Sequence, residues 1–565
     1  MRAAEKSANR RIRLLLGLFV LVFAIVLARA AWLQVVQGPR YAKLAETQHR
    51  ETQKTPAGRG TIFDRTGVQL AIGRQTTTVF ADPHQIRNAA AVARAASDVL
   101  GVEANALYPK LLDKSTQFVY VQRFADPEQA ALLEKRKLAG LGFYPEERRT
   151  YPQGKVGAQV IGYAGVDNKG LTGLEVQYDR KLRGRPGSRT IVRDGRGQAI
   201  DVLESLPEQK GADVFTTLDH TIQAQAEAVM RATVAQWGAK AATAIVLDPK
   251  SGDVLAMAQA PGFNANRASD VPLELQRNHA VTDLYEPGST FKLVTVTGVL
   301  SEGLVEPDTA FTLPYSIPVA DRVIHDSHQR ETQTFSVAQI LEYSSNVGAV
   351  TLAKELGEER LARWVERFGF GRATGIDFPG ESEGIVLPLE QWSGSTIGNV
   401  PIGQGISVTA IQMASIYAAV ANNGVWVQPH LVSRVGGRAP FTPAKRRIMS
   451  AEVNRQVKAM LKDVVAAGTG TEAAVPGYTV AGKTGTAQKP DGHGGYSSSR
   501  YVASFVGMVP ASDPQLVVLV LVDEPSLIWG GVVAAPAFAS IAKFGLQYLE
   551  VPPDAPVDRG TLSAG

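Results

Sequence analysis

One stretch constrains the fold of this chain more than any other: residues 286–292, Glu-Pro-Gly-Ser-Thr-Phe-Lys, which run directly into the largely apolar residues 293–300. The Pro-Gly pair can start a helix, and the apolar run predicts that this helix is buried. Residues three apart share a helix face, so Ser289 and Lys292 would point the same way from the first turn. A buried lysine tends to lose its proton, which would place a general base beside a nucleophile. The same residues also fit a plain helix start, with Ser289 near the cap and Lys292 reaching out to solvent.

The composition excludes several kinds of site. The chain has 565 residues, and it contains no cysteine. A chain of this length is expected to form about two to four domains. Disulfides, thiolate metal sites and cysteine nucleophiles are excluded. The formal net charge of +5 is small for this length, and no basic stripe is interleaved with aromatic residues, so we expect no nucleic-acid partner.

The N-terminus predicts a membrane anchor. Basic residues are concentrated in residues 1–13, and residues 14–33 are apolar except for Arg29. A helix of that length spans roughly 30 Å, which is enough to cross a bilayer core. The positive-inside rule makes residues 1–13 a cytoplasmic tail and places the rest of the chain outside. A cleaved signal peptide is the alternative, because residues 28–30 have the Ala-x-Ala form; both interpretations export the remaining chain.

The polarity and the hydrophobic periodicity of the chain change near residue 220. Residues 34–221 are polar with short alternating stretches, which predicts a β-rich, non-catalytic module with one or two small helical insertions, such as 88–100. Residues 222–549 interleave helical patterns with apolar strands, which predicts an α+β layered domain, and residues 550–565 predict a flexible tail. In that domain we expect helices at 221–237, 335–356 with a break at 343–346, 410–421, 453–464 and 535–549, a hairpin at 243–257, and strands at 478–483, 501–509 and 516–522. The last strand is apolar throughout, so it should lie in the middle of a sheet that is covered on both faces.

Three other patterns in the sequence indicate different activities or sites. Residues 477–484 satisfy the P-loop pattern of an NTPase, but the glycines and the proline that follow prevent the helix such a loop needs. Residues 380–384 match the nucleophile elbow of α/β-hydrolases, yet Ser382 lies between two glutamates with a proline nearby, which favours a surface turn. His325 and His328 lack a third ligand, so we expect surface or packing residues rather than a metal site.

What remains is a set of three short motifs. In chain order they are Ser289-x-x-Lys292, Ser344-x-Asn346 and Lys483-Thr484-Gly485. Each alone has an ordinary explanation, such as helix capping for Ser344 and Asn346. Their order and approximate spacing are those of penicillin-binding proteins and serine β-lactamases, which this chain therefore resembles.

The resemblance covers most of the chain and is to class B penicillin-binding proteins. Residues 59–65 and 170–175 are similar to segments of that family's pedestal, and no stretch resembles a glycosyltransferase module. The short anchor, the moderate pedestal and the absence of a C-terminal extension look more like the division-specific, FtsI-type branch than the elongation branch. The family implies a transpeptidase domain, with a central antiparallel sheet and helices on both faces, carried on an elongated β-rich pedestal behind a single transmembrane helix.

The resemblance also implies a reaction. Ser289 would attack the carbonyl between the two D-alanines of a peptidoglycan stem peptide while Lys292 takes its proton, and an amine of a neighbouring stem peptide would resolve the acyl-enzyme. Ser344 would relay a proton to the departing D-alanine, and Asn346 would orient the peptide and Lys292. Lys483 would disfavour protonation of Lys292, adding to the effect of burial. No metal or cofactor is required.

The third motif would bind the substrate. Lys483, Thr484 and Thr486 would hold the terminal carboxylate of the stem peptide. Gly485 would leave room for the substrate backbone. Backbone N–H groups of Ser289 and Thr486 would form the oxyanion hole.

Partners and location follow from the same resemblance. It implies a target of β-lactams at the bacterial cytoplasmic membrane and the division septum, with a SEDS-family glycosyltransferase and other cell-division proteins as partners. An elongation-type transpeptidase, a non-catalytic β-lactam-binding scaffold or sensor, and a P-loop NTPase are the alternatives. No Glu-x-x-x-Asn of the kind that activates water in class A β-lactamases occurs between Asn346 and Lys483. We therefore expect a long-lived penicilloyl-Ser289.

Overall fold

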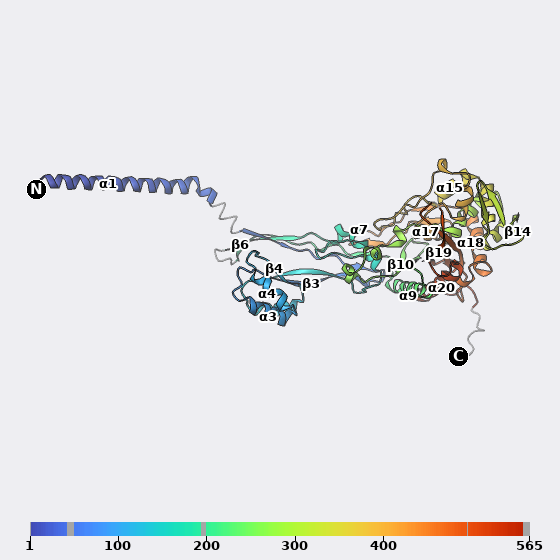
Figure 1. Ribbon diagram of the computed structural model, residues 1–565, viewed down its shortest axis with the longest axis horizontal. Coiled ribbons are helices and arrows are strands. Elements are labelled where there is room, and N and C mark those ends of the chain that lie inside the picture. The colour runs from blue at the N-terminus through green and yellow to red at the C-terminus, as the bar shows by residue number, and fades with distance from the viewer. Residues whose placement is uncertain (1, 42–49, 194–198, 494, 557–565) are drawn as a thin grey trace. The chain divides into compact units, whose positions relative to one another are not determined.

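The computed structural model describes residues 2–41, 50–193, 199–493 and 495–556 (Figure 1). The chain forms two compact units, Met1–Gly58 with Gly184–Lys210 and Arg59–Arg183 with Gly211–Gly565. The first unit contains α1 (Arg2–Ala31), a π-helical turn η1 (Trp32–Val36) and an antiparallel sheet of β1 (Arg50–Thr55), β6 (Gly187–Arg193) and β7 (Ala199–Leu206).

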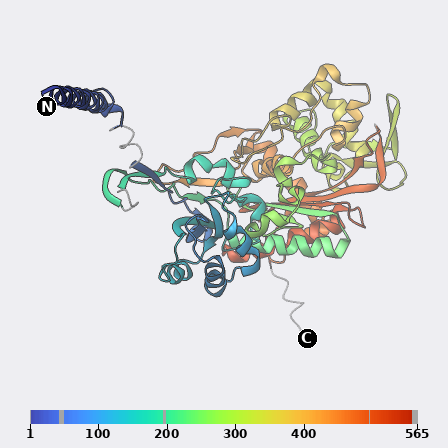
Figure 2. The same cartoon turned by 60° about the vertical axis from the view of Figure 1, so that its left-hand side comes forward.

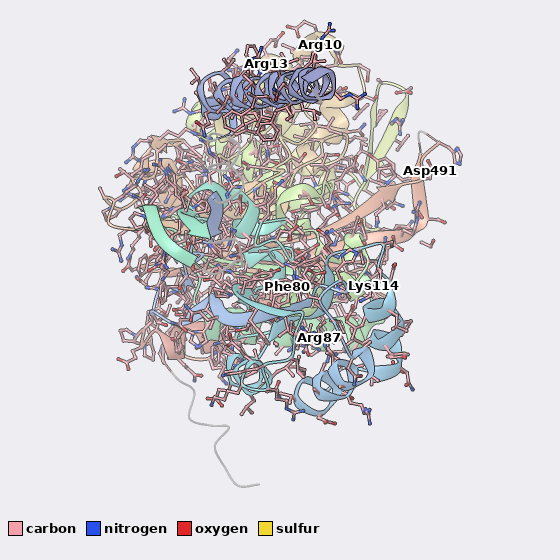
Figure 3. All side chains as sticks on the ribbon, turned by 90° about the vertical axis from the view of Figure 1, so that its left-hand side faces the viewer. Arg10, Arg13, Phe80, Arg87, Lys114 and Asp491 are labelled. Atoms are coloured by element: carbon pink, nitrogen blue, oxygen red, sulfur yellow. The ribbon has the colours of Figure 1, made fainter. Side chains whose placement is uncertain are left out.

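Helix α1 and the turn η1 together contain the predicted anchor. The stretch Asn9–Val36 is long and apolar enough to cross a membrane, with a mean hydropathy of 2.7, and it is not buried in the protein. The predicted segment 14–33 lies inside it. Arg10 and Arg13 precede the apolar residues on the same helix (Figure 3). A basic flank on this side fits the predicted orientation.

A five-stranded antiparallel sheet forms the centre of the second unit. Its strand order is β10-β9-β20-β19-β18, with bounds Ala241–Leu247 (β9), Val254–Ala260 (β10), Ala481–Pro490 (β18), Tyr496–Val509 (β19) and Leu516–Asp523 (β20). Strand β20 lies in the middle and is buried over most of its length. The expectation from its unbroken run of Val and Leu is therefore confirmed.

Helices cover both faces of this sheet (Figure 2). Val518 and Val520 face α9 (His220–Trp237) and α20 (Ala535–Tyr548). Val517 and Leu519 belong to the core on the other face of the sheet. The helices of that core are α12 (Lys292–Ser301), α14 (Asn346–Leu356), α17 (Ala410–Ala421) and α18 (Ala451–Ala466). Successive strand residues point to opposite faces, so one apolar strand can serve two cores. This is the α+β arrangement that the family resemblance implied.

Capping residues set the helix bounds. Asp219 accepts hydrogen bonds from Thr221 N and Ile222 N at the start of α9. Ser336 and Gln339 form the predicted capping box of α13 (Val337–Glu342). Helix α14 starts at Asn346, so the predicted break at 343–346 is confirmed.

A second, six-stranded sheet lies in the N-terminal part of this unit. It comprises β2 (Ile62–Phe63), β3 (Gln69–Ala81), β4 (Val119–Ala125), β5 (Leu141–Thr150), β8 (Val214–Thr216) and β16 (Val432–Val435). Asn88 caps the predicted helix at α3 (Ala89–Leu100). The insertion is larger than predicted, because α4 (Ala104–Leu112) and α5 (Pro127–Glu134) pack with α3 in the same apolar core. Figure 3 labels Phe80 and Lys114 in this part of the chain.

Except for one helix of 11 residues, the remaining elements of the second unit are short. They are α6 (Ala158–Ile161), α7 (Gly173–Gln177), α8 (Asp179–Leu182), η2 (Ala265–Asp270), α10 (Leu273–Gln276), α11 (His279–Thr282), η3 (Gly288–Phe291), β11 (Ala310–Leu313), β12 (Ser316–Val319), β13 (Arg322–His325), β14 (Gln333–Ser336), α15 (Glu358–Phe368), η4 (Leu389–Gln391), α16 (Thr396–Asn399), η5 (Val400–Ile402), β15 (Val425–Val427), β17 (Lys445–Arg447), η6 (Thr471–Ala473) and α19 (Gly530–Val533).

Two predicted boundaries need correction. The boundary between residues 221 and 222 falls inside α9, which begins at His220 because Asp219 caps it. The segment 550–565 was expected to be loose, but its described part is bound to the chain before β18. Asp554 Oδ1 accepts a hydrogen bond from Thr479 N at 2.7 Å, and Val551 O accepts one from the Tyr478 hydroxyl at 2.6 Å. Residues 557–565 lie outside the described residues.

Glu175 joins two buried arginines in the N-terminal part of this unit. Its carboxylate oxygens lie 2.6 Å from Arg59 and 2.6 Å from Arg149, and all three side chains are at most 2% exposed. We expect Glu175→Ala to lower the free energy of unfolding by about 3–5 kcal/mol, because it leaves the buried Arg149 without its anion and Arg59 with Asp179 alone. A lower thermal midpoint of the full-length protein in detergent micelles would show this.

The matched control is Glu274→Ala. This residue pairs with Arg277 at 3.1 Å, but both side chains are about half exposed or more. An exposed pair contributes about 0–1 kcal/mol. Equal midpoints for the two variants would contradict a stabilising role of the Glu175 network.

Candidate active site

The proposed nucleophile lies in a tight turn against the edge of the central sheet. Ser289 is the second residue of the single 3₁₀ turn η3, which continues into α12 at Lys292. Gly288 has a φ of +56°, and its N–H donates to Gly403 O at 3.0 Å. A Cβ at Gly288 would lie 3.1 Å from Thr486 O, so the turn packs directly on β18. A positive φ and this close approach both favour glycine.

Lys292 is held by the second motif. Its side chain is fully buried, and Nζ donates to Asn346 Oδ1 at 2.8 Å and to Ser344 Oγ at 3.2 Å, with a further hydrogen bond to Ser344 O. Burial lowers the pKa of Lys292 to about 7, although the negative charge of Asp326 acts in the opposite direction. A substantial fraction of this amine is therefore neutral near physiological pH.

Lys483 reaches the same hydroxyl from the strand. Its Nζ donates to Ser344 Oγ at 2.9 Å, and the side chain is fully buried. Burial and the charge of Lys292 both lower the pKa of Lys483. Ser344 has a φ of +60°, an uncommon conformation for a residue with a side chain, and its hydroxyl lies between the two amines. The structure thus brings Lys292, Ser344, Asn346 and Lys483 into one hydrogen-bonded cluster.

Ser289 is not part of that cluster. Ser289 is half-buried, and no residue in the described part of the chain forms a hydrogen bond with its hydroxyl. Lys292 N donates to Ser289 O, so the two residues share the first turn as predicted. The amine of Lys292 is directed to Ser344 and Asn346, because these two residues supply its acceptors.

Strand β18 carries the third motif at the edge of the sheet. Thr484 Oγ1 lies 2.7 Å from Thr469 Oγ1 and 3.3 Å from Lys483 Nζ. Thr486 Oγ1 accepts a hydrogen bond from Gly530 N at 3.3 Å. Both hydroxyls therefore have protein partners near Lys483.

Gly485 lies directly against the turn that carries Ser289. A Cβ there would lie 3.0 Å from Pro287 O and 3.1 Å from Thr290 Cγ2, and it would also clash with Ser504 Oγ. The missing side chain makes room for the turn that carries Ser289.

The sequence analysis missed one residue that organises this cluster, Asp326. Its side chain is 9% exposed, and its carboxylate accepts hydrogen bonds from Asn346 N at 2.6 Å and from Val347 N at 3.0 Å. It also binds the Ser345 hydroxyl and forms an ion pair with Arg330 at 2.7 Å. A carboxylate at this position satisfies free N–H groups of the first turn of α14 and complements the helix dipole. Its position within His-Asp-Ser-His was the only signal in the sequence, and that pattern was interpreted as surface or packing residues.

The chain is similar to known proteins over most of its length. The penicillin binding protein transpeptidase domain matches residues 242–543, and the penicillin-binding protein dimerisation domain matches residues 54–216. Peptidoglycan D,D-transpeptidase FtsI of Escherichia coli strain K12 is 32% identical over 98% of this chain and 94% of its own length. The chain belongs to the penicillin-binding proteins. The crystal structure of penicillin binding protein 3 from Mycobacterium tuberculosis, complexed with aztreonam, has 31% sequence identity and a TM-score of 0.71, and the match covers 89% of this chain and 99% of that one.

In this penicillin-binding protein the competing motifs form no site of their own. The P-loop pattern at 477–484 runs into strand β18, which continues to Pro490 where a P-loop would need a helix. Figure 3 shows Asp491 at the far end of the β18–β19 hairpin. Ser382 lies in a loop, as predicted. The ring of His328 faces Trp529, with the centroids 5.4 Å apart, which fits a packing role.

Proposed function

We propose that this protein is a peptidoglycan D,D-transpeptidase that acts through an acyl-Ser289 intermediate. The observation that carries the proposal is the Ser344 hydroxyl between two buried lysine amines, one of which shares the first helical turn with Ser289. A neutral amine linked by a hydroxyl to a second amine can take up a proton and deliver it elsewhere. The family match to a transpeptidase domain supports the same activity.

The reaction has two steps. In the first, Ser289 Oγ attacks the carbonyl carbon of the D-alanyl-D-alanine amide, and its proton passes to Lys292. The C–N bond then breaks, and the departing D-alanine nitrogen receives a proton through Ser344, which leaves a Ser289 ester. In the second, an amine of a neighbouring stem peptide attacks that ester, and Ser289 recovers its proton as the new amide forms. The proton transfers of this scheme use only side chains of this chain, and the scheme needs no cofactor.

Strand β18 supports both charge stabilisation and substrate binding. In an antiparallel strand the N–H and C=O of one residue point to the same edge. The carbonyl of Thr486 faces the turn at Gly288, away from β19, so the N–H of Thr486 also points to the free edge beside Ser289. We propose that this N–H and that of Ser289 form the oxyanion hole. Lys483, Thr484 and Thr486 would bind the terminal carboxylate.

Covalent labelling tests the proposal. A labelled penicillin should acylate the wild-type protein, and Ser289→Ala should abolish the label completely because the only proposed nucleophile is gone. Ser382→Ala is the matched control, since it removes the serine of the competing motif and should leave labelling unchanged. The label should also persist, because no water-activating Glu-x-x-x-Asn follows Asn346. Labelling that survives Ser289→Ala, or rapid release of the label, would contradict the assignment.

We further propose a location and partners. The apolar helix would anchor the protein in the bacterial cytoplasmic membrane with residues 1–13 inside, and the catalytic domain would act outside at the division septum. A SEDS-family glycosyltransferase and other division proteins would be its partners. Residues from 34 to the start of α9 would form the non-catalytic pedestal, and α9 to residue 549 the transpeptidase domain. Imaging a tagged protein in dividing cells tests the septal role, and uniform labelling of the lateral wall would contradict it.

A further inference from the structure

A hollow rich in arginine lies on the helical side of the second unit, outside the active site. Its volume is about 620 Å³, and its walls come from α15, α17, β15, β17 and the end of α12. Five arginines line it, which are Arg363, Arg367, Arg372, Arg446 and Arg447. None of the residues proposed to act on the substrate contributes to it.

The charge of this hollow is poorly compensated. Only two carboxylates, Glu302 and Glu366, line it together with the five guanidinium groups. Glu302 already accepts a hydrogen bond from Trp364 Nε1 at 3.0 Å. Glu366 forms an ion pair with Arg372, so four arginines have no carboxylate partner among the lining residues. The positive charges of Arg372 and Arg367 act together with burial to lower the pKa of Arg446. Arginines that repel one another around a hollow indicate a site that would be stabilised by an anion.

Aromatic rings hold two of these arginines in place. Arg367 lies over the ring of Trp364 at 5.0 Å, and Arg446 lies over the ring of Trp426 at 4.9 Å. Arg446 donates to Arg367 O and Phe368 O, and Arg367 Nε donates to Ile448 O at 2.6 Å. Each guanidinium has five N–H donors, so several donors of each group remain available after these bonds. Stacked, pre-oriented guanidinium groups suit bidentate recognition of planar or tetrahedral oxyanions.

We propose that this hollow binds a phosphate-bearing ligand with at least two negative charges. Its volume is that of a small-molecule site. The excess of three positive charges over the lining carboxylates favours a multiply charged anion such as a phosphate monoester or a diphosphate. A membrane lipid headgroup and a soluble phosphate ester both offer this chemistry. The inference does not depend on the proposed transpeptidase reaction, because it involves no residue of that mechanism.

Calorimetric titration of the full-length protein with inorganic pyrophosphate tests the site. In non-ionic detergent, we expect binding that weakens as salt is added, since the contacts are charge-assisted. The double variant Arg363→Gln/Arg372→Gln should lower the affinity by about tenfold or more, as two charged donors are lost. The Arg372 side chain is 70% exposed and Arg363 is also exposed, so folding should be unaffected.

The matched control removes two exposed arginines elsewhere. Arg183 and Arg231 are each 55% exposed and lie outside the hollow. The variant Arg183→Gln/Arg231→Gln has the same net charge as the test variant and should bind pyrophosphate as the wild type does. No binding to the wild type, or equal losses in the two double variants, would overturn the proposal.

Nanodiscs distinguish the two sources of the ligand. If a lipid headgroup occupies the hollow, anionic phospholipid should weaken pyrophosphate binding to the wild type relative to zwitterionic phospholipid, and this difference should vanish in Arg363→Gln/Arg372→Gln. Equal affinity in the two lipids, with the loss in the variant retained, assigns the site to a soluble phosphate ester.

Discussion

Replacing Lys292 by methionine should lower the rate of Ser289 acylation by a labelled penicillin about 10²- to 10⁴-fold, the range that a positioned general base contributes. Methionine keeps the length and the apolar stem of the side chain, so the buried volume changes little. It removes the amine that donates to Ser344 Oγ and Asn346 Oδ1. In the wild type the same rate should rise with pH through about 7, because only the neutral amine can accept the proton of Ser289.

Two measurements separate this effect from general damage. Lys354→Met removes an exposed lysine of α14 and should leave the acylation rate unchanged. In Lys292→Met, the rise of rate with pH near 7 should disappear together with the fast rate. A variant that acylates slowly but keeps the wild-type pH profile would show that another group is the base. Lys483 would be the first candidate, since its Nζ also contacts Ser344 Oγ.

Much of the fold could be predicted from the sequence because many helices and strands are marked by patterns among neighbouring residues. The run 516–522 has no polar alternation, and only a strand buried on both faces tolerates that pattern. The capping pair of Ser336 and Gln339 marks the start of a helix within four residues. The break at 343–346 is likewise visible in the chain itself. Such signals depend on neighbours in sequence, so no tertiary information is needed to interpret them.

The sequence predicted which residues form the candidate site, but it did not predict the hydrogen bonds between them. Three ordered motifs identified the residues, yet the direction of the Lys292 amine depends on Ser344 and Asn346, about fifty residues away. The close approach of Gly485 to the turn at Pro287 was not predicted either, because only the folded chain brings these two segments together. The bound tail at Asp554 escaped detection for the same reason, since its partner Thr479 is distant in sequence. Contacts between distant segments produce no periodic pattern in the sequence, so they could not be predicted from it.

Asp326 has the next largest expected effect, and it acts through other residues. Asp326→Ala should slow acylation by about 10²-fold, since Asn346 N and Val347 N lose their acceptor and the start of α14 can shift. It should also lower the thermal midpoint, because Arg330 loses its buried partner. This variant alone does not separate positioning from folding.

Asp326→Asn combined with Arg330→Gln makes that separation. The asparagine can still accept from the N–H groups of α14, while the ion pair is removed as a whole and no lone charge remains. Burial lowers the pKa of Lys292, and the negative charge of Asp326 raises it. Burial and the charge of Lys292 both lower the pKa of the neighbouring Lys483. Loss of that charge should therefore move the rise of acylation rate with pH to lower pH than in the wild type. A purely structural role would leave the midpoint of that rise where it is, so an unchanged pH profile would contradict the electrostatic role of Asp326.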